Sequence, residues 1–322
     1  MELPINILTR LYRIQSKSGS ETQMLQYLEG LLPLLGDNIT VQNIKNNLYI
    51  TKGQAENYPC IVAHTDQVQT ASPNIRILPL DDLFVGFDFK QKKQVGLGAD
   101  DKNGIFMVIL ALIKFPIIKA CLFHGEETGC LGSSTCDMEF FNDCRFVLQC
   151  DRKGNKDFIN VGAKTELCGQ DFITDCQLDS FGYAETDGMI TDVVTLKQRG
   201  LSVACCNISC GYYNPHTEYE VSKISDIEKC WELVQHILSL PKTYPHVYTP
   251  QVIKPLPPIN NTPKTVGIRS VKLQKAYAIR IINKNPGLSD TEIVSLWIEK
   301  RRGFQSISLV QFKKLYNEKN NR

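Results

Sequence analysis

The sequence has no run of eighteen apolar residues, so no membrane-spanning helix is expected. Polar and basic side chains recur within the first fifteen residues, where a secretory signal would need an unbroken apolar stretch. Internal repeats and low-complexity segments are absent, and so is the Cys-x-x-Cys spacing of a zinc ribbon. These absences favour a globular protein that acts outside the membrane.

Cysteine is abundant, with twelve residues in a chain of 322. A disulfide framework is typical of much smaller secreted proteins. Several of the cysteines lie within or beside apolar runs, where a free thiol packs as a small hydrophobic group: Cys60, Cys121, Cys150, Cys205 and Cys206. We therefore expect free, buried thiols and a cytoplasmic protein.

The net charge of +2 conceals an uneven distribution of charge. Residues 1–263 carry 23 basic and 30 acidic side chains, a balance of −7, whereas residues 264–322 carry 13 and 4, a balance of +9. A proline-rich segment, 241–263, separates a larger domain from a basic one and is typical of an extended linker or a surface strap. The predicted division is a large domain 1–240, the linker 241–263 and a basic domain 264–322.

The large domain alternates strand-like and helical patterns. Strands are expected at 46–51, 60–64, 84–89, 118–124, 145–150 and 202–208, and helices at 4–15, 21–35, 103–114, 129–136, 170–177, 188–199 and 225–239. This alternation predicts an α/β fold with a largely parallel sheet covered by helices on both faces. In the basic domain, helical patterns near 272–287, 289–303 and 309–319 predict a small all-α bundle, compatible with a helix-turn-helix.

Histidine and acidic side chains follow the expected strands. The motif AHTDQV places His64 and Asp66 at the end of a strand, two residues apart and therefore on one side of it. A neutral imidazole is a good zinc ligand, and a carboxylate on its other nitrogen fixes the tautomer. In GLGADDKNG, Asp100 and Asp101 precede a helix, where capping of that helix is the alternative to metal binding.

Three further segments complete the pattern. Glu126 and Glu127 end the strand of KACLFHGEETG, where one carboxylate can bind a metal while its neighbour accepts a proton. Asp151 follows the strand RFVLQC, and His216 lies in the loop GYYNPHTEYE. Each segment alone is compatible with an ordinary turn. Together, two histidines and three carboxylates can hold two divalent metal ions that share one carboxylate. Oxygen and nitrogen ligands suit zinc, with cobalt or manganese as alternatives.

In these stretches the sequence resembles the dinuclear zinc exopeptidases that include peptidase T and the tetrahedral and glutamyl aminopeptidases. LYRIQSKSGSE, AHTDQV, GLGADDKNGI, FHGEETGCLGS, LQCD and NPHTEYE occur in the family's order over roughly residues 8–240. The resemblance implies a three-layer αβα sandwich of the zinc-exopeptidase type with a mostly parallel mixed sheet. It implies one metal on His64 and Asp151, a second on Glu127 and His216, and Asp100 bridging them.

The resemblance also implies the chemistry. Asp66 would orient His64, and Glu126 would take a proton from the attacking water and return it to the leaving amine. Tyr212 or Tyr213 could hydrogen-bond the oxyanion, although packing around the site is the commoner explanation for both. The gaps from 64 to 100 (36 residues) and from 151 to 216 (65 residues) are too short for an inserted lid or dimerisation domain of about 100 residues. A lidless enzyme is therefore expected.

Several functions remain open at this level. An aminopeptidase or di-/tripeptidase acting on a short peptide is the leading prediction. An amidohydrolase that acts on an N-acyl substrate, or a carboxypeptidase, is the first alternative, and a metal-binding but inactive scaffold is another, against which Glu126 argues. The basic domain, with Lys300, Arg301 and Arg302, could bind nucleic acid, but a solvated face that docks on the acidic domain is the favoured explanation. The oligomeric state stays open.

Overall fold

The structure is a computed structural model that describes residues 3–248, 275, 278–289, 292–293, 296 and 309–320. The chain divides into two compact units, Met1–Pro250 and Gln251–Arg322. Most of the proline-rich segment and Lys300–Arg302 lie outside the described residues. The domain boundaries proposed at 240 and 263 therefore stay predictions.

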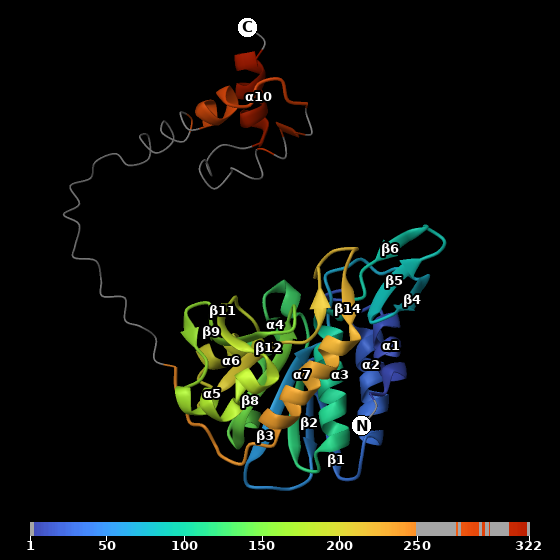
Figure 1. Ribbon diagram of the computed structural model, residues 1–322, viewed down its shortest axis with the longest axis vertical. Helices are drawn as coiled ribbons and strands as arrows, with labels where there is room; N and C mark the ends of the chain where they lie inside the picture. Colours follow the sequence, from blue (N-terminus) through green and yellow to red (C-terminus); the bar gives the residue numbers. More distant parts are fainter. Residues whose placement is uncertain are drawn as a thin grey trace, which may run out of the picture. The chain divides into compact units, whose positions relative to one another are not determined.

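A nine-stranded mixed sheet forms the centre of the larger unit (Figure 1). Its strands follow the order β1 (Ile39–Ile44), β2 (Asn47–Lys52), β7 (Ile118–Phe123), β3 (Tyr58–His64), β8 (Cys144–Arg152), β12 (Cys205–Ser209), β9 (Asp157–Gly162) and β10 (Thr165–Glu166), with β11 (Ala184–Gly188) beside β9. The central strands β7, β3, β8 and β12 run parallel, and antiparallel pairs lie toward both edges. The predicted mixed sheet with a parallel centre is confirmed.

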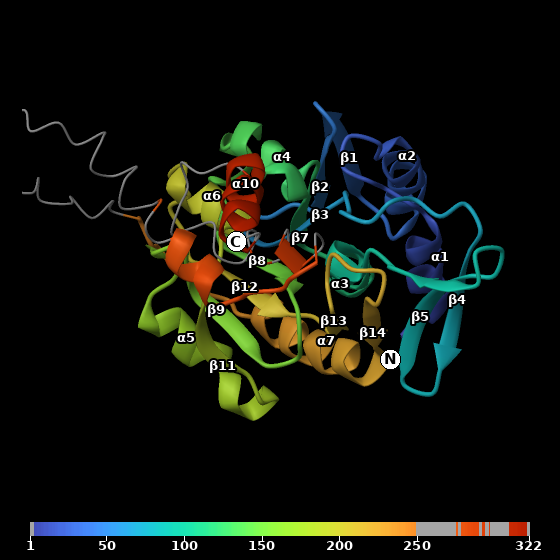
Figure 2. The same cartoon turned by 90° about the horizontal axis from the view of Figure 1, so that it is seen from above.

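Apolar side chains cover both faces of the central strands, because successive residues of a strand point to opposite sides. On β3, Ile61 and Ala63 belong to one apolar cluster, whereas Cys60 and Val62 belong to another. The first cluster includes side chains from α1 (Ile5–Arg13), α2 (Thr22–Leu31), α3 (Ala99–Lys114), α5 (Gln170–Cys176) and α7 (Ile224–Leu238). On the opposite face lie α4 (Leu131–Thr135) and α6 (Asp192–Gln198). Helices thus cover the sheet on both sides, as expected (Figure 2).

The expected strand 84–89 does not belong to the main sheet. As β5 (Leu83–Asp88) it lies in a separate five-stranded antiparallel sheet with β4 (Ile75–Leu80), β6 (Lys93–Val95), β13 (Tyr212–Tyr213) and β14 (Val221–Lys223). Its residues alternate between buried and half-buried, as in a strand with one solvated face. An apolar run shows that a strand forms, but not which sheet the strand joins.

The two gaps between the predicted metal-binding motifs hold small elements of these sheets. The residues between His64 and Asp100 contain β4, β5 and β6, and those between Asp151 and His216 contain β9 to β13 with α5 and α6. Within residues 3–248, neither gap contains an inserted domain, in agreement with the expected lidless arrangement.

In the smaller unit, α10 (Leu309–Asn320) corresponds to the third expected helix, and residues 278–283 are helical within the first. Side chains from the three expected helical segments form one apolar cluster: Ala278, Ile282, Ile293, Leu296, Phe312 and Tyr316. The Tyr316 hydroxyl donates to the Asn285 carbonyl and accepts the Leu288 N–H, both at 2.7 Å.

All twelve cysteines are free and buried, as expected. No helix among the described residues has the length and apolar character needed to cross a bilayer.

Candidate metal centre

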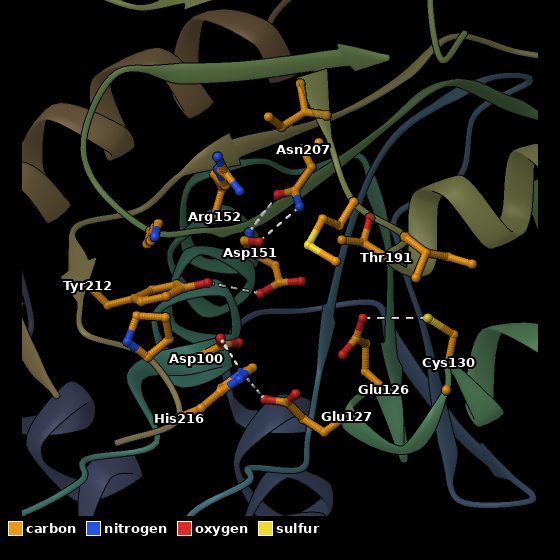
Figure 3. Close-up of a pocket in the computed structure, with 17 residues that line it drawn as sticks. Asp100, Glu126, Glu127, Cys130, Asp151, Arg152, Thr191, Asn207, Tyr212 and His216 are labelled. Carbon is orange, nitrogen blue, oxygen red and sulfur yellow. Dashed lines mark hydrogen bonds and ion pairs between the residues drawn. The ribbon is translucent and has the colours of Figure 1, made fainter. Parts of the chain in front are cut away.

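The predicted metal ligands meet at the carboxyl ends of the parallel strands, where open α/β sheets place their binding sites. His64 ends β3, Asp151 lies near the end of β8, and Glu127 follows β7. Asp100 lies at the start of α3, and His216 lies in the loop between β13 and β14. Four of these five line a cavity of about 450 Å³ (Figure 3): Asp100, Glu127, Asp151 and His216.

Asp100 lies between the two imidazoles. Its Oδ1 atom is 3.2 Å from Nε2 of His64, and its Oδ2 atom is 3.1 Å from Nε2 of His216. Asp151 Oδ1 lies 3.7 Å from the same nitrogen of His64, and Glu127 Oε1 lies 2.9 Å from that of His216. The five side chains therefore form two groups that share Asp100.

The electrostatics of the cluster favour positive charge at its centre. Burial opposes protonation of His64, but the carboxylates of Asp100, Asp151 and Asp66 outweigh this effect and raise its pKa. The neighbouring carboxylates of Asp100 and Glu127 likewise raise the pKa of His216 to about 10. Burial opposes ionisation of Asp100, yet the two imidazoles hold its pKa well below its usual range.

Asp66 contacts both His64 and the loop that carries the two glutamates. Its Oδ1 atom lies 3.2 Å from Nδ1 of His64, opposite the ring nitrogen that faces Asp100. The backbone N–H groups of Glu126 and Glu127 donate to the two Asp66 oxygens, at 2.9 and 3.2 Å, and the Ser18 hydroxyl donates at 2.6 Å. Asp66 is thereby fixed by groups from three segments of the chain.

Glu126 also lines the cavity, and its Oε1 atom accepts a weak hydrogen bond from the Cys130 thiol at 3.5 Å (Figure 3). Burial raises the pKa of Glu126, and the charges of Glu127 and Asp100 add to this effect against the opposing charge of His64. Glu126 thus combines access to the cavity with a raised affinity for a proton, the properties of a general base.

Asp101 has a different environment from Asp100. Its Oδ1 atom accepts the N–H of Gly104 at 3.0 Å, and its Oδ2 atom accepts the N–H of His64 at 3.2 Å. The first bond caps α3, whose regular helical dihedrals begin after Asp101. Of the two adjacent aspartates, one caps the helix and the other faces the histidines.

The donor set fits divalent cations. Single donor atoms of His64, Asp100 and Glu127 lie within 4.8 Å of one another, as do those of His64, Asp101 and Asp151. The buried Oε1 atom of Glu127 makes no hydrogen bond of good geometry and lies 2.9 Å from Nε2 of His216. Buried carboxylates at this density need a compensating positive charge. Nitrogen and oxygen donors without a thiolate suit zinc, cobalt or manganese.

The two tyrosines differ in their positions. The Tyr212 hydroxyl lines the cavity and donates to Asp151 Oδ1 at 3.3 Å. The Tyr213 hydroxyl donates to Asp226 Oδ2, and its side chain does not line the cavity. Of these two alternatives for the oxyanion, only Tyr212 lies at the cavity, because β13 directs neighbouring side chains to opposite sides.

Sequence reasoning missed two residues that support the ligands. Asn207 on β12 joins the backbone of Asp151, accepting its N–H at 2.8 Å and donating to its carbonyl at 2.9 Å. Glu220 is fully buried and accepts backbone N–H groups from the residues that lead into Asp100. Burial raises the pKa of Glu220 to about 7.

Comparisons with known proteins agree with this architecture. Aminopeptidase PepT from Bacillus cereus has a similar structure, with a TM-score of 0.57 and 14% identity over 73% of this chain and 96% of that one. A tripeptidase from Staphylococcus aureus gives a TM-score of 0.55 with 15% identity over 73% and 96%. An aminopeptidase from Desulfurococcus kamchatkensis gives 0.54 with 15% identity over 73% and 94%. No protein-family model and no curated protein matches the sequence. These similarities establish the fold.

Proposed function

We propose that the larger unit is a metal-dependent exopeptidase that hydrolyses short peptides, most directly an aminopeptidase or di-/tripeptidase of the cytoplasm. The observation that carries the proposal is the position of Asp100 between the imidazoles of His64 and His216, 3.2 and 3.1 Å away. This arrangement lies at the carboxyl edge of the sheet, in a fold like that of aminopeptidases and a tripeptidase.

The cluster would hold two divalent cations, zinc in the first place. His64 and Asp151 would hold one, Glu127 and His216 the other, and Asp100 would lie between them. Bound cations would polarise the scissile carbonyl and lower the pKa of water. The distances between the donor atoms of these five side chains and their lack of thiolates support this assignment.

Two carboxylates would act without binding metal. Asp66, on Nδ1 of His64, orients the ring so that Nε2 faces the centre. Glu126 would accept the proton of the attacking water at its carboxylate and deliver it to the leaving amine. Its raised pKa and its place in the cavity wall support this role.

The remaining cavity wall would bind the substrate. Arg152 and Lys153 line it as cationic side chains, and Arg152 Nε is fixed by Asp157 Oδ2 at 3.0 Å. Met189 and Ile190 add apolar surface and are 78% and 53% exposed. A short peptide would place an apolar side chain on this surface and a carboxylate beside Arg152. In the absence of an inserted lid, this wall takes over the recognition of the substrate.

The alternative is an amidohydrolase that acts on N-acyl substrates or a carboxypeptidase, since both use the same metal chemistry. The test combines metal analysis of the purified protein with a screen of di- and tripeptides whose amino or carboxyl ends are free or blocked. The proposal predicts bound divalent metal and hydrolysis that requires a free amino end, stops with a chelator and returns with zinc, cobalt or manganese. Cleavage of N-acylated substrates alone would favour the alternative, and failure to hydrolyse any substrate in the metal-loaded state would contradict both.

A further inference from the structure

Glu220 binds the backbone that leads into Asp100. Its Oε2 atom accepts the N–H groups of Gly98 at 2.6 Å and Ala99 at 3.1 Å, and its Oε1 atom accepts the N–H of Asp100 at 3.3 Å. The side chain is completely shielded from solvent. Three charge-assisted hydrogen bonds from consecutive residues therefore converge on one buried carboxylate.

This backbone needs an external acceptor. Asp100 has φ −80° and ψ 101°, outside the helical region, so its N–H and those before it have no place in the regular hydrogen bonds of α3. Gly98 has φ +64°, and a Cβ there would lie 2.6 Å from Gln67 Oε1 and 2.7 Å from Lys102 Nζ. The left-handed backbone conformation favours glycine at Gly98. Glu220 satisfies the amides that this turn exposes.

The loop that carries Glu220 also carries His216. His216 Nε2 lies 3.1 Å from the carboxylate of Asp100, while Glu220 holds the backbone N–H of the same residue. A single short loop, 216–220, therefore fixes Asp100 from both its side chain and its main chain.

A side chain also donates to the Glu220 carboxylate. Gln69 Nε2 donates to Glu220 Oε2 at 3.2 Å. The buried amine of Lys102 lies beside this network, where it donates to Gln67 Oε1 and, at 2.8 Å, to the Leu97 carbonyl. Gln67 and Gln69, which follow β3, thereby connect the strand that carries His64 to the turn before α3.

We propose that Glu220 is a positioning residue that fixes the Asp100 carboxylate between the two groups of metal ligands. Its contribution acts through Asp100 and does not involve contact with substrate. The inference rests on the proposed function for its effect on turnover, whereas its effect on metal affinity follows from the metal centre alone. Removal of outer partners of metal ligands typically costs 10- to 100-fold in metal affinity or activity.

The test compares Glu220→Gln with Glu218→Gln, an exposed residue of the same loop that pairs with Lys93 at the surface. Zinc affinity is measured by chelator competition on the folded, metal-free proteins, alongside kcat, KM and thermal unfolding. Glu220→Gln should weaken zinc affinity and lower kcat about 10- to 100-fold with KM within about twofold. Glu218→Gln should resemble the wild type in each measurement.

The proposal is overturned if Glu220→Gln lowers the unfolding temperature while its zinc affinity and kcat match those of Glu218→Gln. If Glu220→Gln does not fold, Gln69→Met serves in its place, because it removes the amide that donates to Glu220. A weaker zinc affinity in Gln69→Met supports the proposal, and an unchanged one overturns it. If the wild type hydrolyses no peptide, the proposed function fails, while the zinc measurement still decides this inference.

Discussion

Oδ1 of Asp66 accepts the backbone N–H of Glu126 at 2.9 Å, so the carboxylate beside His64 also fixes the loop of the proposed general base. Replacement by Asn keeps the size of the side chain but removes its charge and one acceptor. We predict that Asp66→Asn lowers kcat about 10- to 100-fold and weakens metal affinity, because both His64 and Glu126 lose their orientation. Steady-state kinetics and metal content measure the two effects. Wild-type kinetics in Asp66→Asn would show that neither residue depends on Asp66.

Substitution of Arg152 tests whether the substrate places its carboxylate beside this side chain. We predict that Arg152→Gln raises KM about tenfold for tripeptides with a free carboxylate and leaves KM for their C-terminal amides unchanged, because a charge-assisted hydrogen bond is lost. Lys156→Gln is the matched control, since Lys156 is exposed on the same segment but does not line the cavity. Longer peptides with an internal acidic side chain distinguish a terminal carboxylate from a side-chain one. Equal losses for free and amidated peptides would contradict the assignment.

The titration of the buried Asp192 carboxyl predicts that the free energy of unfolding depends on pH. It is fully buried beside Glu126, its Oδ1 accepts the Ser133 hydroxyl, and its Oδ2 has no partner. Burial raises its pKa from 3.8 to about 8. The folded state therefore binds this proton more tightly, so the stabilisation is complete below pH 3.8 and is lost as pH rises toward 8.

Asp192→Asn should remove this dependence, because its amide keeps an acceptor for Ser133 and does not ionise. Urea unfolding of the metal-free proteins at pH 5 and pH 8 measures how the free energy of unfolding depends on pH. Between pH 5 and pH 8, the free energy of unfolding of the wild type should fall relative to that of the variant, by about 1.4 kcal/mol for each pH unit crossed. Parallel pH profiles for the two proteins would show that Asp192 titrates normally.

The burial of the cysteines predicts how the protein reacts with a thiol reagent. All twelve are free and buried, and burial raises the pKa of thiols such as Cys121 and Cys206. Because the thiolate is the reactive form, the native protein should react slowly with a thiol reagent, and twelve thiols should titrate once it is unfolded. Rapid modification of several thiols in the native state would contradict the packing described.

The sequence predicted the central strands and the principal helices because their apolar residues recur with a clear period or form buried runs. Strand β11 escaped prediction, since Ala184–Gly188 contains three polar residues in the middle and lies largely exposed beside β9. β5 pairs with its neighbours β4 and β6, and also with β14, more than 130 residues later. The apolar run 84–89 does not distinguish these partners from the strands of the main sheet, and the pairing with β14 leaves no local pattern.

The site was more predictable than the sheet edges. His64, Glu127 and Asp151 each follow or end a buried strand, and parallel strands bring their carboxyl ends to one edge. Glu220 was not predictable in this way, because its partners Gly98 to Asp100 precede it by about 120 residues and are backbone groups. Residue types can suggest ligands, but they do not reveal what holds a ligand's main chain.

Glu126→Gln tests the central claim most directly, because it removes the proposed base and leaves every proposed metal ligand in place. Turnover of the best short peptide is measured on metal-loaded wild type and variant, with metal content determined on the same samples. The account predicts a loss of kcat of at least about 100-fold with the full complement of metal retained. A variant that retains its metal and hydrolyses the peptide at the wild-type rate would contradict it.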